Sequence, residues 1–228
     1  AYLKDLLDGL DKDIFRQKKI LSAVKGIVPG PDVLLNEYLA QQFGLELKDY
    51  FAVLGPCHAE EVAAEKLSYL TFSGVDEEAT AGIAQYFQAL YIYTVINPDI
   101  LGVQYAAVLK NIYALGAGIA HGLEYGDNFL SVYIANSADE MAGFLKKAGI
   151  QHIVVGEHQT NPITHKRDTN YAASVYLGDL LVTCYSLYSR NRTFGNMIGK
   201  GYTVQSAQLE MNMVAEGYNA RKCMYHIN

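Results

Sequence analysis

The pattern of hydrophobic and polar positions changes character near residue 97. Before it, short apolar runs alternate with amphipathic stretches, which is typical of strands separated by helices. Strands are predicted over 18–24, 50–54, 69–73 and 91–96, and helices over 3–15, 32–43, 58–67 and 77–90. Afterwards the chain reads as nearly all helix, over 98–124, 127–148, 175–188, 193–199 and 204–214. We therefore predict an α/β layer over 1–97, followed by an all-α domain over 98–228.

The chain is organised around the apolar stretch 98–124, which predicts one long helix. Asn97 is the expected N-cap, with Pro98 at the first helical position. A helix that is apolar on all sides is either a membrane span or the central helix of a helical core. Lys110 and Asn111 in its middle weigh against a span, because charge at mid-membrane depth is costly.

Lys110 is also the first candidate for chemistry. A lysine among apolar neighbours loses solvation, which disfavours its charged form. Such a group suits acid–base catalysis near neutral pH. Alternatively, its ammonium reaches solvent from a half-exposed helix. The helix alone supports both interpretations equally.

Composition limits the class of protein. The 228 residues suffice for one large or two modest domains, and a 50% hydrophobic content allows a sizeable core. The net charge of −6 argues against general nucleic-acid binding. Three scattered cysteines fit a reducing compartment, and with no signal peptide we expect a cytoplasmic protein. The abrupt start and end of the sequence suggest a fragment.

Two segments before residue 97 place polar groups where strands end. Lys25 follows a predicted strand, and strand ends are where open α/β sheets bind ligands. An ordinary exposed lysine in a turn is the simpler interpretation. At 55–61, GPCHAEE, a strand meets a helix whose N–H groups can bind a polar ligand. Cys57 there is either a nucleophile or a small contact, and His58 reads as a cap-region or core histidine rather than a catalytic base.

The stretch 178–192 is the second informative segment of the helical part. Asp179 and Thr183 are four residues apart and share one helix face, where they can orient a lysine or bind a polyol. Arg190 and Asn191 lie at the break before another helix, which is a phosphate site in outline. A capped helix with a solvated arginine explains the same residues.

A metal site is not expected. His152, His158 and His165 fall in a polar stretch over 150–170 that we predict to be a long surface loop. Their spacing is poor for zinc, and no cysteine pair supports them.

Taken together, these segments resemble bacterial-type NAD(P)-dependent glycerol-3-phosphate dehydrogenases. The matching pieces follow the family's order: SAVKGI around Lys25, GPCHAEEVA at 55–63, GVQYAAVLKNIYALGAGIAHGLEYGDN at 102–128, GDLLVTCYSLYSRNRTFG at 178–195 and VAEGY at 214–218. Three features depart from the family's pattern: Cys57 stands where serine or threonine is usual, VYLGDL replaces AGLGDL, and the 150–170 stretch is longer. The family's glycine-rich GxGxxG turn is absent from 1–228.

The resemblance implies a fold and an activity. The fold would be the later part of a Rossmann-type α/β domain over 1–97, followed by an all-α domain similar to the C-terminal domain of 6-phosphogluconate dehydrogenase. The family interconverts sn-glycerol 3-phosphate and dihydroxyacetone phosphate with NAD or NADP, feeding phospholipid synthesis. Because this sequence lacks the first turn of the nucleotide fold, we expect the chain as given to be inactive alone.

The resemblance also implies roles for individual residues. The implied catalytic group comprises Lys110 as acid/base, with Asp179, Lys25 and Thr183. The implied substrate-binding residues are Lys25, Gly55, Cys57, Asn111, Asp179, Ser189, Arg190 and Asn191. The implied cofactor-binding residues are Lys25, Ala59, Arg190, Val214 and Glu216.

Expected partners are therefore the small-molecule substrate and the nucleotide, with no nucleic acid and no membrane span. An uncovered sheet edge tends to pair with another chain, so self-association, for example as a homodimer, is also expected. Two alternatives stay open from the residues: another lysine-dependent hydroxyacid dehydrogenase, or a helical homologue that lost the chemistry.

Overall fold

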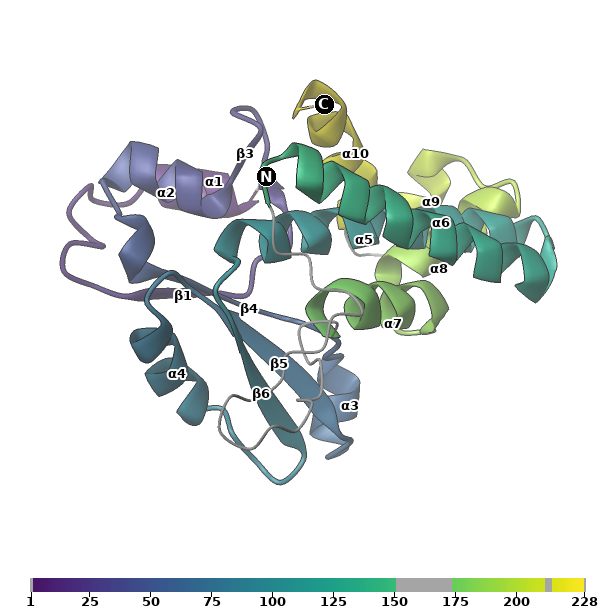
Figure 1. The fold of residues 1–228 in the computed structure, drawn as a ribbon. Coiled ribbons are helices and arrows are strands. Elements are labelled where there is room, and N and C mark those ends of the chain that lie inside the picture. The colour runs from purple at the N-terminus through teal and green to yellow at the C-terminus, as the bar shows by residue number, and fades with distance from the viewer. Residues whose placement is uncertain (1, 151–173, 212–214, 228) are drawn as a thin grey trace.

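A computed structural model describes residues 2–150, 174–211 and 215–227 (Figure 1). The part before residue 98 holds all strands of the described chain. The strands are β1 (Ile20–Ser22), β2 (Ile27–Val28), β3 (Val33–Leu34), β4 (Tyr50–Leu54), β5 (Ser68–Ser73) and β6 (Ile92–Asn97). The helices between them are α1 (Tyr2–Asp8), α2 (Leu35–Phe43), η1 (Leu47–Asp49), α3 (Ala59–Ala63) and α4 (Glu77–Gln85).

Four of these strands form one sheet in the order β1-β4-β5-β6. β1 runs parallel to β4, and β5 runs parallel to β6, with Ser68 opposite Ile92 and Ser73 opposite Asn97. The central pair β4–β5 is antiparallel. The predicted α/β layer is therefore confirmed, as a mixed sheet.

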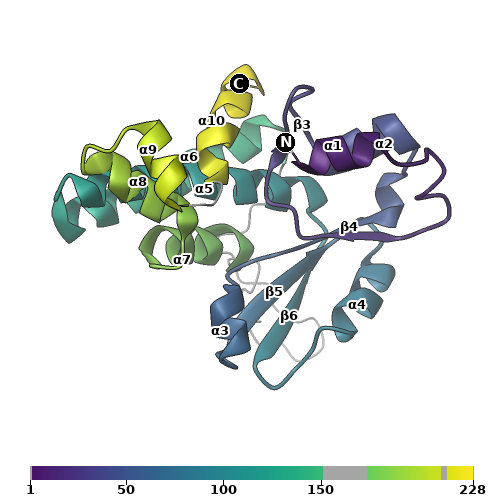
Figure 2. The same cartoon turned by 180° about the vertical axis from the view of Figure 1, so that it is seen from behind.

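The rest of the chain is helical, and its elements are α5 (Ile100–Gly122), α6 (Gly126–Lys147), η2 (Ser174–Gly178), α7 (Asp179–Tyr185), α8 (Arg190–Gly199), α9 (Val204–Met211) and α10 (Glu216–Ile227). α5 is the central helix, with α6, α7, α8 and α10 around it (Figures 1 and 2). By length and composition α5 could cross a membrane, yet 78% of its most apolar window is buried inside the chain. It is the core helix that the apolar pattern predicted.

One hydrophobic core joins the strand-containing part to the helices. Tyr50 and Leu54 of β4 belong to the same buried cluster as Val103 and Ala107 of α5. α5 therefore packs directly on the sheet as well as on the other helices.

The predicted cap of α5 is wrong by two residues. Asp99, not Asn97, is the N-cap, and its Oδ1 accepts the Gly102 N–H at 2.8 Å. The Asn97 side chain instead accepts the Asp99 N–H at 2.9 Å, which forms a turn just before the helix. Pro98 consequently lies outside the helix.

Several other boundaries also differ from the prediction. Residues 27–34, expected as a loop and a helix start, form the small β2–β3 hairpin. The predicted helix 175–188 is divided into the π-helical turn η2 and the short α7. α10 was not predicted. The end of α2 at Gly44 was predicted correctly, and Gly44 has the positive φ of 66° that is typical of a helix C-terminus. Most of the predicted 150–170 loop lies outside the described residues.

Glycines allow α5 and α8 to touch backbone to backbone. A Cβ at Gly118 would lie 2.0 Å from the carbonyl oxygen of Arg192, and one at Gly195 would lie 2.0 Å from that of Leu115. Real Cβ atoms do not approach backbone so closely, so these helices could not keep this separation with larger residues. The close approach brings the start of α8 against the middle of α5.

We expect Gly195→Ala to destabilise the fold by about 3 kcal/mol, because overpacking at a backbone contact forces the helices apart. Gly143→Ala is the matched control, since it also lies inside a helix but has nothing within 4 Å of its added Cβ. That change should stabilise the chain by about 0.5–1 kcal/mol. Urea denaturation of both variants gives the two values, and equal stability of the two would contradict the packing argument.

Candidate active site

A buried lysine–carboxylate pair lies at the centre of the helical part. Lys110, in the middle of α5, is 3% exposed, and Asp179, the first residue of α7, is 2% exposed. The Lys110 Nζ and the Asp179 Oδ1 form an ion pair. Of the two open interpretations of Lys110, the structure excludes the one in which its ammonium reaches solvent.

The environment of Lys110 brings the pKa of its amine closer to neutral pH. Burial is the largest cause of the shift, Lys25 acts in the same direction and Asp179 opposes both, and together they lower the pKa of Lys110 from 10.5 to about 8. An amine with this pKa exchanges protons readily near neutral pH. The second carboxylate oxygen of Asp179 is buried without a hydrogen-bond partner in the described chain, so it is free to accept a bond from a ligand.

The position of Asp179 depends on the turn before it. The π-helical turn η2 leads directly into α7, and such turns recur at functional sites. Within η2, the Tyr176 hydroxyl donates to the Asp99 carboxylate at 2.5 Å. Because Asp99 also caps α5, this bond ties the start of the helix that carries Lys110 to the turn that presents Asp179.

Thr183 lies one turn along α7 from Asp179, on the same face, as predicted. Its hydroxyl donates to the Asp179 main-chain carbonyl at 2.5 Å, so that hydroxyl is engaged within α7 itself. It is 6% exposed.

The two asparagines that follow Lys110 and Arg190 both meet the start of α10. The Asn111 amide donates to the Glu216 carboxylate at 3.4 Å, and the Asn191 side-chain oxygen accepts the Gly217 N–H at 2.9 Å. A Cβ at Gly217 would lie 2.2 Å from the Asn111 carbonyl oxygen, so α10 packs directly on the α5 backbone. The first turn of α10 thus fixes both amides.

Glu216 completes a charged cluster around this point. Glu216 is an exposed residue, but its carboxyl group accepts a hydrogen bond from the buried Asn111, and desolvation raises its pKa. Lys25, Arg190 and Lys110 oppose that shift, so all three cations lie within electrostatic reach of Glu216. The structure therefore pairs Lys110 with Asp179 and places Lys25 and Arg190 within electrostatic reach of the neighbouring Glu216.

Ser189 and Arg190 begin α8. The Ser189 side chain caps the helix by accepting the Arg192 N–H at 3.3 Å, and Ser189 is buried. Arg190, the first helical residue, is exposed. An arginine at a helix N-terminus beside buried amides is an arrangement suited to a phosphate.

The β4–α3 junction closes the other side of the site. Gly55 has a φ of +126°, and a Cβ there would lie 2.9 Å from the Tyr69 carbonyl oxygen, so only glycine fits. Cys57 is half-buried near Lys25 and Asp179, and burial raises the pKa of its thiol. A protonated thiol is a weak nucleophile, which favours its interpretation as a contact. Ala59 is exposed at the first position of α3.

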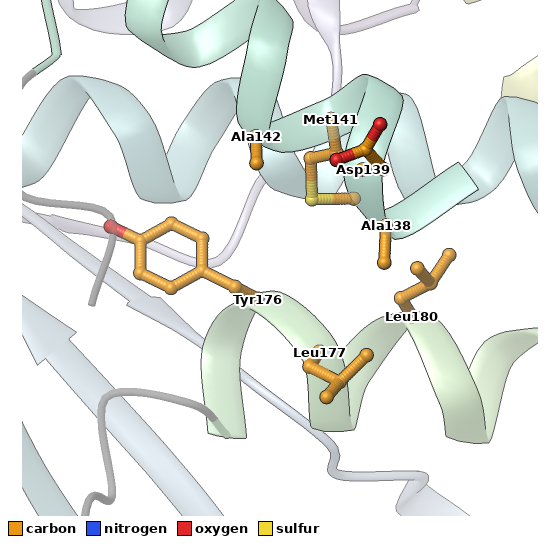
Figure 3. A pocket seen from close by; sticks show the side chains of 7 residues that line it. All are labelled: Ala138, Asp139, Met141, Ala142, Tyr176, Leu177 and Leu180. Atoms are coloured by element: carbon orange, nitrogen blue, oxygen red, sulfur yellow. The ribbon is translucent and has the colours of Figure 1, made fainter. Parts of the chain in front are cut away.

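The described chain also contains a pocket away from this cluster. It measures about 250 Å³ and opens between α6 and the segment from η2 to α7 (Figure 3). Its lining is mostly apolar, and it is formed by Ala138, Asp139, Met141, Ala142, Tyr176, Leu177 and Leu180. None of the predicted site residues lines it, so it is not the place where the lysine chemistry occurs.

The sequence did not point to one residue of the cluster, and some residues that it did point to lie outside the described part of the chain. His58 lies within electrostatic reach of Lys110, Lys25 and Asp179, although the sequence favours a cap-region or core histidine over a catalytic base there. The signal for it in the sequence is its position beside Cys57 in GPCHAEE. Val214 lies outside the described residues, as do the three histidines considered for zinc.

Fold and site together define the class: a chain with a Rossmann-type α/β part followed by a helical part that carries a buried lysine–carboxylate pair. Comparison with known proteins narrows this further. The family model for the NAD-dependent glycerol-3-phosphate dehydrogenase C-terminus matches residues 99–228, and the model for the N-terminus matches residues 1–80. The chain belongs to the NAD-dependent glycerol-3-phosphate dehydrogenase family.

Similar proteins agree with this membership. The NAD(P)+ glycerol-3-phosphate dehydrogenases of Bacillus mycoides and Bacillus cytotoxicus are 33% and 34% identical over 225 residues, which is 98% of this chain. The chain spans 62% and 61% of the length of these two relatives.

Solved structures show the same fold. A glycerol-3-phosphate dehydrogenase from Coxiella burnetii superposes with a TM-score of 0.77 at 25% identity, over 92% of this chain and 58% of that one. One from Plasmodium falciparum gives a TM-score of 0.77 at 22% identity, over 99% of this chain and 60% of that one.

Proposed function

We propose that this chain forms the substrate-binding and proton-transferring part of an enzyme that interconverts sn-glycerol 3-phosphate and dihydroxyacetone phosphate with NAD or NADP. The observation that carries the proposal is the buried Lys110–Asp179 pair, set among Lys25, Arg190 and two amides. Family membership supplies the reaction, and the cluster supplies groups of the kind that the reaction needs.

Lys110 acts as the acid/base on the oxygen at C2. Oxidation of the alcohol requires a base to remove the hydroxyl proton, and reduction of the ketone requires an acid to return it. Burial makes the neutral amine accessible, and Asp179 stabilises the ammonium once it forms. The unpartnered oxygen of Asp179 orients a substrate hydroxyl, while Thr183 holds the turn that carries Asp179.

Arg190 and Asn191 bind the phosphate end, together with Asn111 and the start of α8. A guanidinium offers paired donors to phosphate oxygens, and helix N–H groups favour an anion. Ser189 contributes by shaping that helix terminus, since its hydroxyl oxygen is already used as the cap. Gly55 and Cys57 line the substrate from the β4–α3 side.

The residues assigned to cofactor binding include charged groups, which suit the polar groups of a dinucleotide. Lys25, Arg190 and Lys110 all act electrostatically on the carboxyl group of Glu216, so a bound nucleotide would meet both positive and negative charge near the acid/base. Ala59 and Val214 complete the assignment. When bound, the nicotinamide supplies or accepts the hydride at C2. Lys25 contacts substrate and cofactor, and Lys110 handles the proton.

The organisation of the chain is part of the proposal. Residues 1–97 belong to the nucleotide-binding domain and residues 98–228 form the substrate domain. The whole protein would then be a cytoplasmic enzyme of glycerophospholipid metabolism that is able to form a homodimer.

The test is a steady-state assay of the whole gene product with NAD and NADP, using glycerol 3-phosphate and a 2-hydroxy acid that lacks a phosphate. Activity with glycerol 3-phosphate alone supports the proposal. Activity with the hydroxy acid alone would favour the other lysine-dependent dehydrogenases, and no activity with either would favour a helical homologue without chemistry.

The same assay should show a pH dependence of opposite sign in the two directions. For oxidation, kcat/KM should rise with pH through about 8, because the base is the neutral amine of Lys110. For reduction it should fall above that pH, because the ammonium is the acid. Parallel profiles in both directions would contradict the role of Lys110.

A further inference from the structure

His58 occupies the last position before α3, at the end of the turn that follows β4. Its backbone carbonyl accepts the N–H groups of Glu61 and Val62, each at 3.1 Å, so the first turn of the helix holds this residue in place. The turn begins at Gly55, whose backbone conformation only glycine adopts readily. The imidazole is therefore presented from a fixed backbone.

The His58 ring reaches across to the helical part of the chain. It lies against the Tyr188 ring, with centroids 6.0 Å apart, and Tyr188 comes just before the cap of α8. The Nε2 atom of His58 is buried and has no hydrogen-bond partner among the described residues. A buried polar atom without a partner is costly, and in native sites it often marks a group that a ligand completes.

The charges around His58 are those of the active site. The groups that act on it most are Lys110 from α5, Glu61 from α3, Lys25 from the β1–β2 connection and Asp179 from α7. Burial lowers the pKa of His58, the two lysines lower it further, and the two carboxylates oppose them. The imidazole is consequently neutral at neutral pH, with one N–H donor and one acceptor nitrogen.

The proposed function leaves one substrate group without an assigned partner. In that proposal Lys110 and Asp179 bind the oxygen at C2, and Arg190 and Asn191 bind the phosphate. The terminal hydroxyl at C1 is a polar group that must also be hydrogen-bonded once the site closes around it. His58 lies within electrostatic reach of Lys110 and Asp179, and its buried Nε2 has no hydrogen-bond partner among the described residues.

We propose that His58 is a substrate-binding residue whose Nε2 hydrogen-bonds the terminal hydroxyl of the three-carbon phosphate ester. This inference rests on the proposed function. His58 would then select a hydroxymethyl group over a methyl group. A substrate without the hydroxyl leaves the buried Nε2 without a hydrogen bond, which lowers the affinity for that substrate.

The experiment compares two ligands and measures their affinity by NMR titration of the whole gene product. One ligand is dihydroxyacetone phosphate, and the other is acetol phosphate, which carries a methyl group in place of the terminal hydroxymethyl. The variants are His58→Phe, which keeps a ring against Tyr188, and His58→Gln, which keeps a hydrogen-bonding amide. His121→Gln, at an exposed position near the end of α5, is the control.

We expect the unaltered gene product to bind dihydroxyacetone phosphate about tenfold more tightly than acetol phosphate. His58→Phe should remove that preference by weakening only the first ligand, His58→Gln should restore part of it, and His121→Gln should change neither affinity. Equal weakening of both ligands in His58→Phe, or an unchanged preference, would overturn the assignment. If the unaltered gene product binds acetol phosphate but without preferring the hydroxyl, the inference fails and the phosphate site stands. If it binds neither ester, the proposed function fails, and this inference fails with it.

Discussion

Replacing Lys110 by methionine is expected to lower kcat of the whole gene product about 10³- to 10⁴-fold, because the reaction then lacks its acid/base. Methionine is close to lysine in length and is apolar, so it fills the same buried space. Cofactor affinity should change little, since removal of a proton-transfer group acts on the chemical step. Steady-state kinetics and titration with NADH and NADPH measure the two quantities separately.

Lys200→Met is the matched control, because Lys200 is an exposed lysine at the end of α8. It should leave both kcat and cofactor affinity unchanged. A Lys110→Met enzyme with near-normal kcat would show that another group moves the proton, and a large loss of cofactor affinity would show a binding role instead.

The central helix could be predicted from the sequence because its signal is strong and local. The apolar stretch 98–124 is long, and it contains Lys110 and Asn111 where a membrane span would not tolerate them. The structure confirms a core helix over Ile100–Gly122, with Lys110 buried at its centre. The four strands of the main sheet could be predicted for the same reason, since short apolar runs bounded by turn residues leave few alternatives. The short β2–β3 hairpin was missed.

The N-cap residue of α5 could not be predicted from the neighbouring sequence alone. Asn97 and Asp99 are both good capping residues, and propensity alone does not rank them. The deciding contact is tertiary: Tyr176, far along the chain, donates to Asp99 and fixes it at the cap. The end of α7 and the presence of α10 likewise depend on packing against α5 rather than on their own sequences.

The active-site cluster was predictable only through resemblance. Nothing in the spacing of positions 110 and 179 implies an ion pair, because contact over such a separation depends on the whole helical arrangement. The ordered motifs supplied that link, and the structure places the pair together. The same motifs did not single out His58, whose unpartnered Nε2 is visible only in three dimensions.

Asp179→Ala is expected to cost about 3–5 kcal/mol of stability at neutral pH, because it leaves the buried Lys110 ammonium without its counter-charge. Removing the opposing carboxylate also lets the pKa of Lys110 fall below its present value of about 8. The unfolded chain keeps the ordinary lysine value of 10.5. Between the lowered pKa and that value the unfolded state binds more protons, so the stability of the variant rises with pH. The deficit relative to the unaltered chain should therefore shrink as the pH approaches about 8.

Two further variants identify the buried charge as the cause, and urea denaturation across pH measures all three. Asp127 is also an acidic residue in the first turn of a helix, but it is exposed, so Asp127→Ala should cost only about 0.3–1 kcal/mol through the helix dipole. The double change Lys110→Met with Asp179→Ala leaves no buried charge, and it should recover most of the lost stability. If the double variant were as unstable as Asp179→Ala alone, the loss would come from the packing of α7 against α5 and not from the unpaired ammonium.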